Sequence, residues 1–124
     1  MRAKVFLASA ALFLSLGISS ASAHTTLIGS TPSKGAVLKV SPKIISLRFE
    51  EPLLTLKGHT INRVTLQDSK NLNIPLGKIS VIGQSVIAQI TTPLTTLGKY
   101  RVNYRVAAQD GHVVTGSYFF TLQN

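Results

Sequence analysis

The side chains best suited to binding a metal ion are few in this sequence: three histidines, four carboxylates and no cysteine. Two of them stand two residues apart in Asp110-Gly111-His112. In extended chain, residues two apart project to the same side, so this carboxylate and this imidazole can converge on one ion. The alternative is an ordinary hairpin turn, because Asp-Gly is a common turn dipeptide.

His24 gains a second donor atom if it becomes the first residue of the chain. An N-terminal histidine offers its amine nitrogen and its imidazole Nδ1 to one ion, whereas an internal histidine has only an amide nitrogen. Nitrogen ligation of tetragonal geometry suits Cu(II), and amine and imidazole donors favour Cu, Ni or Zn over Ca or Mg. A histidine without function at a frayed terminus is the alternative. His24, Asp110 and His112 together would supply three nitrogen donors and one oxygen donor, and we predict that they form one metal site.

Residues 1–23 predict a cleaved secretory signal peptide, which makes His24 the new terminus. A short basic start is followed by an apolar run over residues 5–18 and by small residues at 19–23, which end in an A-x-A cleavage signal. The apolar run is shorter than the ~20 residues of a membrane-spanning helix. We therefore expect a periplasmic or otherwise exported protein, with one domain at residues 24–124 and no membrane span after cleavage.

Composition excludes several kinds of site. Without cysteine there is no thiolate metal site, no disulfide and no cysteine catalysis. The sole methionine is Met1, which leaves with the signal peptide, so a Cu(I) site built from methionine thioethers is not expected. Loss of residues 1–23 lowers the formal charge from +9 to +7. The cations are scattered, and Arg101 and Arg105 fall on the solvent face of a predicted strand, which indicates a mildly basic surface and no nucleic-acid partner.

Apolar and polar residues alternate with a period of two along most of the chain after residue 24, which predicts strands. Turn-forming sequences separate these runs, and no stretch carries a helical apolar stripe with caps. We expect an all-β fold of about seven strands, an Ig-like or cupredoxin-like Greek-key sandwich or barrel. The predicted strands cover residues 25–30, 45–49, 60–67, 78–82, 86–90, 100–106 and 116–122.

Four segments carry a family resemblance, in order and over nearly the whole predicted domain. Residues 24–32 read HTTLIGSTP, similar to the pattern H-x-x-L-x-x-S-x-P. Residues 47–52, LRFEEP, and residues 98–106, GKYRVNYRV, are similar to L-x-F-S-E-P and G-x-Y-x-V-x-W-R-V. Residues 108–117, AQDGHVVTGS, are similar to S-x-D-G-H-x-V-x-G. These patterns resemble the CopC family of periplasmic copper-resistance proteins, including its PcoC and YobA-like relatives.

The resemblance implies a role for each matching residue. His24 corresponds to the family's N-terminal histidine, which holds Cu(II) by amine and imidazole. Asp110 and His112 correspond to the carboxylate and the second imidazole at the same ion. Glu51 corresponds to the acidic residue directly before proline in the F-S-E-P segment, which lies close to the site, and we expect a peripheral role for it. The implied function is copper sequestration, delivery or resistance, with one Cu(II) ion and a separate membrane copper transporter as a partner.

Two other functions fit parts of the pattern. An N-terminal histidine also occurs in copper monooxygenases, but this domain is small and the chain has no tryptophan to form a substrate platform. The other alternative is a module that keeps the fold but binds no metal. The presence of His24, Asp110 and His112 argues against it. The remaining histidine, His59, has no counterpart in the family motifs, and we expect it in an exposed loop without a metal. A non-enzymatic copper protein is therefore the main prediction.

Overall fold

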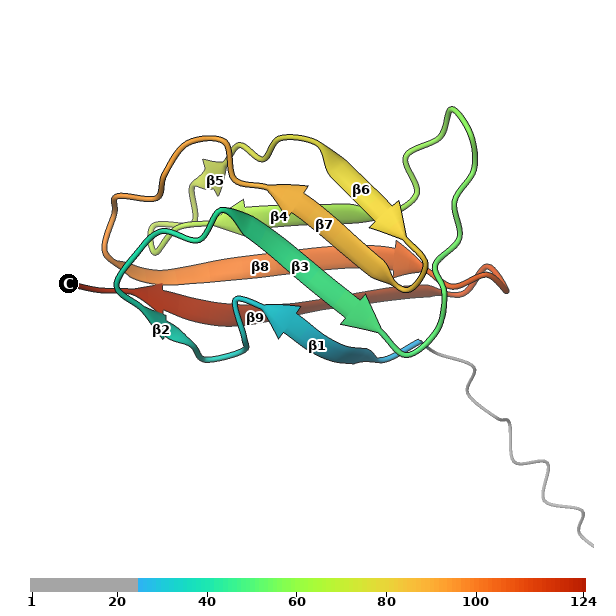
Figure 1. Cartoon of the computed structure of the whole chain (residues 1–124), viewed down its shortest axis with the longest axis horizontal. Helices are drawn as coiled ribbons and strands as arrows, with labels where there is room; N and C mark the ends of the chain where they lie inside the picture. The colour runs from blue at the N-terminus through green and yellow to red at the C-terminus, as the bar shows by residue number, and fades with distance from the viewer. Residues whose placement is uncertain (1–24) are drawn as a thin grey trace, which may run out of the picture.

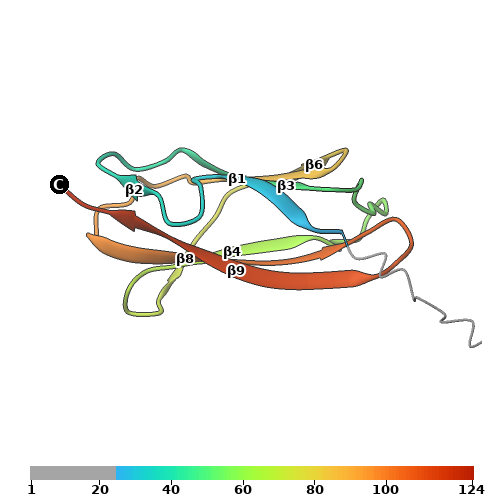
Figure 2. The ribbon, with the colours of Figure 1, turned by 90° about the horizontal axis from the view of Figure 1, so that it is seen from below.

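The structure is a computed structural model that describes residues 25–124, and within this range all regular elements are strands. They pack as two layers, seen face-on in Figure 1 and edge-on in Figure 2. Residues 25–124 include no helix of the length and apolarity that crossing a membrane requires. The strands are β1 (Leu27–Thr31), β2 (Val37–Leu38), β3 (Ile44–Phe49), β4 (Arg63–Gln67), β5 (Asn73–Ile74), β6 (Ile79–Ile82), β7 (Ser85–Gln89), β8 (Gly98–Ala107) and β9 (Val113–Leu122).

One sheet has four strands in the order β1-β3-β7-β6, and the other has five in the order β2-β9-β8-β4-β5. Neighbouring strands are antiparallel except β2 and β9, which run parallel. β8 and β9 form a long hairpin in the larger sheet, with ten paired positions from Gly98 opposite Leu122 to Ala107 opposite Val113. The turn of this hairpin is therefore held by the two longest and most extensively paired strands of the fold.

The core lies between the two sheets and is made by the alternate residues of each strand. In β8, Tyr100 and Val102 are almost fully buried while the residues between and beside them are exposed or half-buried. Phe49 of the smaller sheet meets Tyr104 of the larger sheet edge to face, with ring centroids 5.4 Å apart. Each aromatic contact of this kind contributes about 0.5–1.5 kcal/mol beyond the burial of its area. The core thus joins β3 to β8 directly.

The predicted fold class is confirmed, and the two separate sheets make it a sandwich. Each of the seven predicted strands overlaps an observed one, so the alternation located them correctly. The count of about seven is low by two, because β2 and β5 have only two residues each and show no alternation. The strand predicted at residues 60–67 begins at Arg63, since Asn62 is buried and uses its side chain to bind other backbone.

Candidate metal centre

Residues 108–112 form the turn between β8 and β9 and present Asp110 and His112 to solvent. The N–H of Gly111 donates to the Ala108 carbonyl oxygen at 2.9 Å, and the N–H of Ala108 donates to the His112 carbonyl oxygen at 2.9 Å. Gly111 has a φ of 88°, in the left-handed region that glycine adopts without a steric penalty. Asp110-Gly111 is therefore a hairpin turn, and this turn also brings a carboxylate and an imidazole together.

The Asp110 carboxylate holds His112 at two points. Its Oδ1 accepts the backbone N–H of His112 at 3.0 Å, and its Oδ2 lies 2.8 Å from the His112 Nδ1. The side chains are 38% and 59% exposed, respectively, so the pair stands at the protein surface. The first contact is a local turn that fixes the carboxylate, and the second uses that fixed carboxylate to set the orientation of the ring.

The same contacts assign the proton on the His112 ring. The hydrogen bond from the ring, with a second from the His112 backbone, lowers the pKa of the Asp110 carboxyl. An ionised carboxylate only accepts hydrogen bonds, so Nδ1 is the donor. In the neutral ring the lone pair then belongs to Nε2. A carboxylate bound to one ring nitrogen is the arrangement that commonly orients a metal-binding histidine through its other nitrogen.

The first described residues of the chain are fixed against residues 50 and 51. Thr25 is 1% exposed, and its Oγ1 accepts the backbone N–H of Glu51 at 3.1 Å. The carbonyl oxygen of Thr26 accepts the N–H of Glu50 at 2.8 Å. Figures 1 and 2 both show this beginning of the described chain at the end of the sandwich that carries the β8–β9 turn. Thr25 thus anchors the chain directly after residue 24.

The segment after Glu51 is in turn joined to the β8–β9 turn. Leu53 forms an isolated antiparallel bridge with Ala108, and the N–H of Leu54 donates to the Ala107 carbonyl oxygen at 2.8 Å. Asn62 strengthens this junction: its Nδ2 donates to the Leu54 carbonyl oxygen at 2.8 Å, and its Oδ1 accepts the Ala107 N–H at 3.0 Å. A continuous set of backbone contacts therefore connects Thr25 to the turn that carries His112.

The predicted site residues have different outcomes. Asp110 and His112 are brought together as predicted, whereas His24 lies outside the described residues. Glu51 is exposed and touches Thr25 through its backbone. Within residues 25–124 no three His, Cys, Asp or Glu side chains gather, so Glu51 does not form a cluster with Asp110 and His112. Its peripheral role stays a prediction.

Sequence reasoning missed Thr25 and Asn62, the two residues that join the start of the described chain to the β8–β9 turn. Both are small polar residues that are almost fully buried. One threonine among twelve and one asparagine among five carry no signal of their own. Only the observed pairing of Leu53 with Ala108 shows why polar side chains are needed here.

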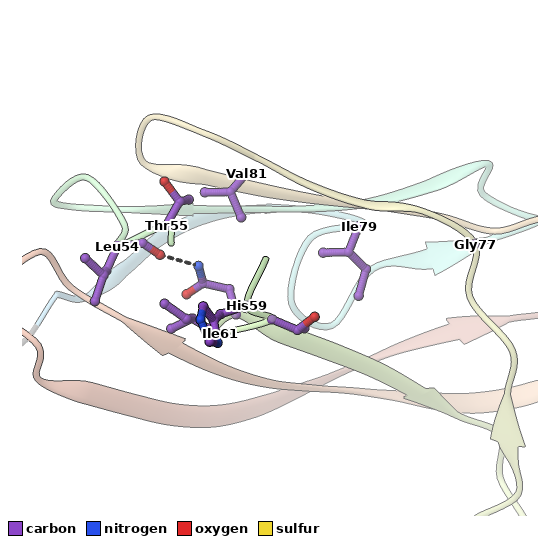
Figure 3. Close-up of a pocket in the computed structure, with 9 residues that line it drawn as sticks. Leu54, Thr55, His59, Ile61, Gly77, Ile79 and Val81 are labelled. Carbon is purple, nitrogen blue, oxygen red and sulfur yellow. Dashed lines mark hydrogen bonds between the residues drawn. The ribbon is translucent and has the colours of Figure 1, made fainter. Parts of the chain in front are cut away.

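His59 lies apart from this arrangement, as predicted, in the exposed loop between β3 and β4. It forms a tight turn in which its N–H donates to the Leu56 carbonyl oxygen at 3.1 Å. Figure 3 shows it at an open groove of about 390 Å³ whose other lining residues include Ile61, Ile79 and Val81. Among residues 25–124, no carboxylate and no second histidine lines this groove, and the expectation that His59 does not bind a metal stays a prediction.

Comparison with known proteins agrees with the fold and with the sequence motifs. The chain is 34% identical over 116 residues to copper resistance protein C of Xanthomonas campestris pv. juglandis, covering 88% of this chain and 87% of that protein. It is 30% identical to copper resistance protein C of Pseudomonas syringae pv. tomato, covering 83% of each chain.

Two solved structures are similar in fold. CopC from Methylosinus trichosporium OB3b superimposes with a TM-score of 0.68 at 25% identity, covering 81% of this chain and 94% of that one. PcoC from Escherichia coli, described as a methionine-rich copper resistance protein, gives a TM-score of 0.64 at 29% identity, covering 82% and 100%. The sequence model of the CopC domain family matches residues 27–123, and the chain therefore belongs to the CopC family of copper resistance proteins.

Proposed function

We propose that this protein binds one Cu(II) ion after export, through the amine and imidazole of His24 together with the imidazole of His112 and the carboxylate of Asp110. The observation that carries the proposal is the hydrogen-bonded Asp110–His112 pair in the β8–β9 turn, which lies at the same end of the sandwich as the beginning of the described chain. Membership of a copper-resistance family supports copper as the metal.

The donors in the described part of the chain fit copper but are too few. Asp110 and His112 supply one carboxylate and one imidazole, and within residues 25–124 no third candidate ligand joins them. A Cu(II) site of tetragonal geometry takes about four donors. His24 would complete the set with two nitrogens. It directly precedes Thr25, whose burial and hydrogen bond to Glu51 fix the point from which His24 extends.

The ring of His112 would bind the ion through Nε2, because Asp110 occupies Nδ1. In this geometry the carboxylate orients the ring. A direct bond from Asp110 to the ion is the further role that the family motif implies; because Nδ1 and Nε2 face opposite sides of the ring, this bond would require the carboxylate to release Nδ1. Glu51 would contribute negative charge near a dipositive ion without binding it.

Copper capture would depend on export, since the amine of His24 exists only after residues 1–23 are removed. The protein would then hold copper in the periplasm and pass it to a separate membrane copper transporter. The methionine-rich relative from E. coli contrasts with this chain, whose single methionine is Met1. This difference supports one Cu(II) site without a second site for Cu(I).

The proposal is tested by competitive titration of copper with a chromophoric chelator. The processed protein is compared with a form that carries one extra alanine before His24. Loss of the free amine should weaken Cu(II) binding by at least about tenfold, since one lost ligand costs more than the 1.4 kcal/mol that tenfold represents. Electron paramagnetic resonance should report nitrogen ligands in the processed form and fewer in the extended form. Equal affinity of the two forms would remove His24 from the proposal.

Histidine variants give the matched comparison. His112→Ala should weaken binding at least as much as the N-terminal extension does, whereas His59→Ala should leave both affinity and spectrum unchanged. The two histidines are both exposed, so neither variant should perturb the core. An effect of His59→Ala equal to that of His112→Ala would contradict the location of the site.

A further inference from the structure

The outer face of the five-stranded sheet carries positive charge and no negative charge. Alternation along β4 and β8 directs four cations to solvent: Arg63, Lys99, Arg101 and Arg105, all exposed. The five strands of this sheet contain no Asp or Glu. The ion pair formed among residues 25–124 joins His112 to Asp110, so no carboxylate there pairs with these four cations.

Two of these cations are placed directly opposite each other. Arg63 of β4 is the register partner of Arg105 of β8, although like charges at paired positions destabilise a sheet. A shallow depression of about 200 Å³ lies between them, and Thr65 and Asn103 also line it. The two guanidinium groups beside this depression are donors that suit phosphate oxygens.

The other two cations flank an exposed aromatic ring. Phe119 of β9 is 41% exposed, and its ring centroid lies 5.0 Å from the Arg101 Cζ and 5.8 Å from the Lys99 Nζ. Arg101 is also its register partner on β8. An apolar ring between two cations is the combination that favours the interface of a lipid bilayer, where the ring enters the headgroup layer and the cations meet phosphates.

We propose that this face, defined by Arg63, Lys99, Arg101, Arg105 and Phe119, docks on an anionic lipid bilayer. The cations extend from residue 99 to residue 105 of one strand, which is about 20 Å at ~3.3 Å per residue. They are spread over an open sheet face that has the breadth of a membrane contact. A bilayer offers both requirements of the face, a layer of negative phosphates and depth for one apolar ring.

Docking in this way would place the β8–β9 turn at the edge of the contact. Arg105 is two residues from the end of β8 at Ala107, and the turn at residues 108–112 follows directly. The proposal does not depend on copper, because none of the five residues belongs to the proposed metal site. Failure of the copper proposal would therefore leave the membrane proposal intact, and the converse also holds.

Binding to vesicles tests the proposal. Protein is isolated from its cells, and its N-terminus is determined by mass spectrometry so that an attached leader does not contribute. We expect sedimentation with vesicles of phosphatidylcholine and phosphatidylglycerol, loss of binding in high salt, and no sedimentation with phosphatidylcholine alone. Each neutralised cation on the face should lower the partition coefficient about fivefold. The double variant Arg63→Gln/Arg105→Gln should then bind about 25-fold more weakly.

A variant of equal charge provides the control. Lys43 and Lys78 are exposed residues that immediately precede β3 and β6 of the other sheet. Lys43→Gln/Lys78→Gln should retain most of the binding, and Phe119→Ser should weaken it with the charge unchanged. Equal losses in the two double variants would show attraction by net charge alone and overturn the proposal. Absence of binding to anionic vesicles, or binding to soluble polyglutamate in preference to them, would overturn it as well.

Discussion

Asn62→Ala should destabilise the sandwich far more than its position next to a loop indicates. The Asn62 side chain is 5% exposed and makes two hydrogen bonds to backbone, at 2.8 Å to the Leu54 carbonyl oxygen and at 3.0 Å from the Ala107 N–H. Alanine would leave both backbone groups without a partner. Each buried group left unsatisfied costs about 1–3 kcal/mol, so we expect a loss of about 2–6 kcal/mol for the two groups.

Denaturant and thermal unfolding of the metal-free protein measure this loss. For a domain of this size, ~1 kcal/mol corresponds to roughly 4–8 °C in midpoint, so the midpoint should fall by at least about 10 °C. Asn103→Ala is the matched control, because Asn103 is half-buried and its side chain makes a single 3.3 Å contact to Gln67 Oε1. Its effect should stay within about 0.5 kcal/mol. A loss below about 1 kcal/mol for Asn62→Ala would refute the reasoning, since solvent would then be satisfying both groups.

Three further outcomes follow from the structure. Asp110→Asn should lower the affinity for copper by about 10- to 100-fold by releasing the His112 ring, with little change in metal-free stability, and chelator competition with unchanged affinity would contradict this. Gly116→Ala should lower the free energy of unfolding by about 1–3 kcal/mol in denaturant, because the added methyl group would overlap the Tyr104 ring and hydroxyl. The double variant Gly116→Ala/Tyr104→Phe should recover part of this loss. An unchanged free energy of unfolding for Gly116→Ala would show that the ring moves away freely. Burial raises the pKa of all three tyrosines above 10.0, so the stability they contribute is complete below pH 10.0 and falls as pH rises further. Tyrosinate absorbance should rise together with loss of the strand signal in circular dichroism, and half-maximal absorbance at or below pH 10.0 in the folded protein would contradict this.

The alternation of apolar residues located most of the fold because one face of each long strand is buried. Val102 and Val106 are fully buried and Arg101 and Arg105 are exposed, as the period of two requires. Strands of two residues carry no such period. β2 exists because Val37 and Leu38 pair with the end of β9, which is a long-range contact that local sequence does not encode.

The contact between Asp110 and His112 was predictable from spacing, but its surroundings were not. Asp110 and His112 lie two residues apart, which predicts that their side chains can converge; in the structure the turn at Gly111 brings them together. Their proximity to the start of the chain depends on the bridge between Leu53 and Ala108, which joins residues far apart in sequence.

The basic face was hidden in the sequence for a related reason. Arg63 and Arg105 are far apart in the sequence and look like scattered surface charge. Only the register of β4 against β8 places them opposite each other. The mildly basic surface predicted from composition thus includes one sheet face with four cations and no carboxylate in its strands, and the predicted exposure of Arg101 and Arg105 is confirmed.

The burial of Thr25 has a consequence for the order of events during maturation. A peptidase must hold several residues on both sides of the bond it cuts as extended chain, and the proposed cut after Ala23 would require Thr25 and Thr26. The folded sandwich uses the same two residues to bind Glu50 and Glu51. Proteolysis at the proposed site and closure of the first strand would therefore compete for one stretch of chain. Processing would have to come first, and the newly freed amine would reach the β8–β9 turn in the same step that completes folding.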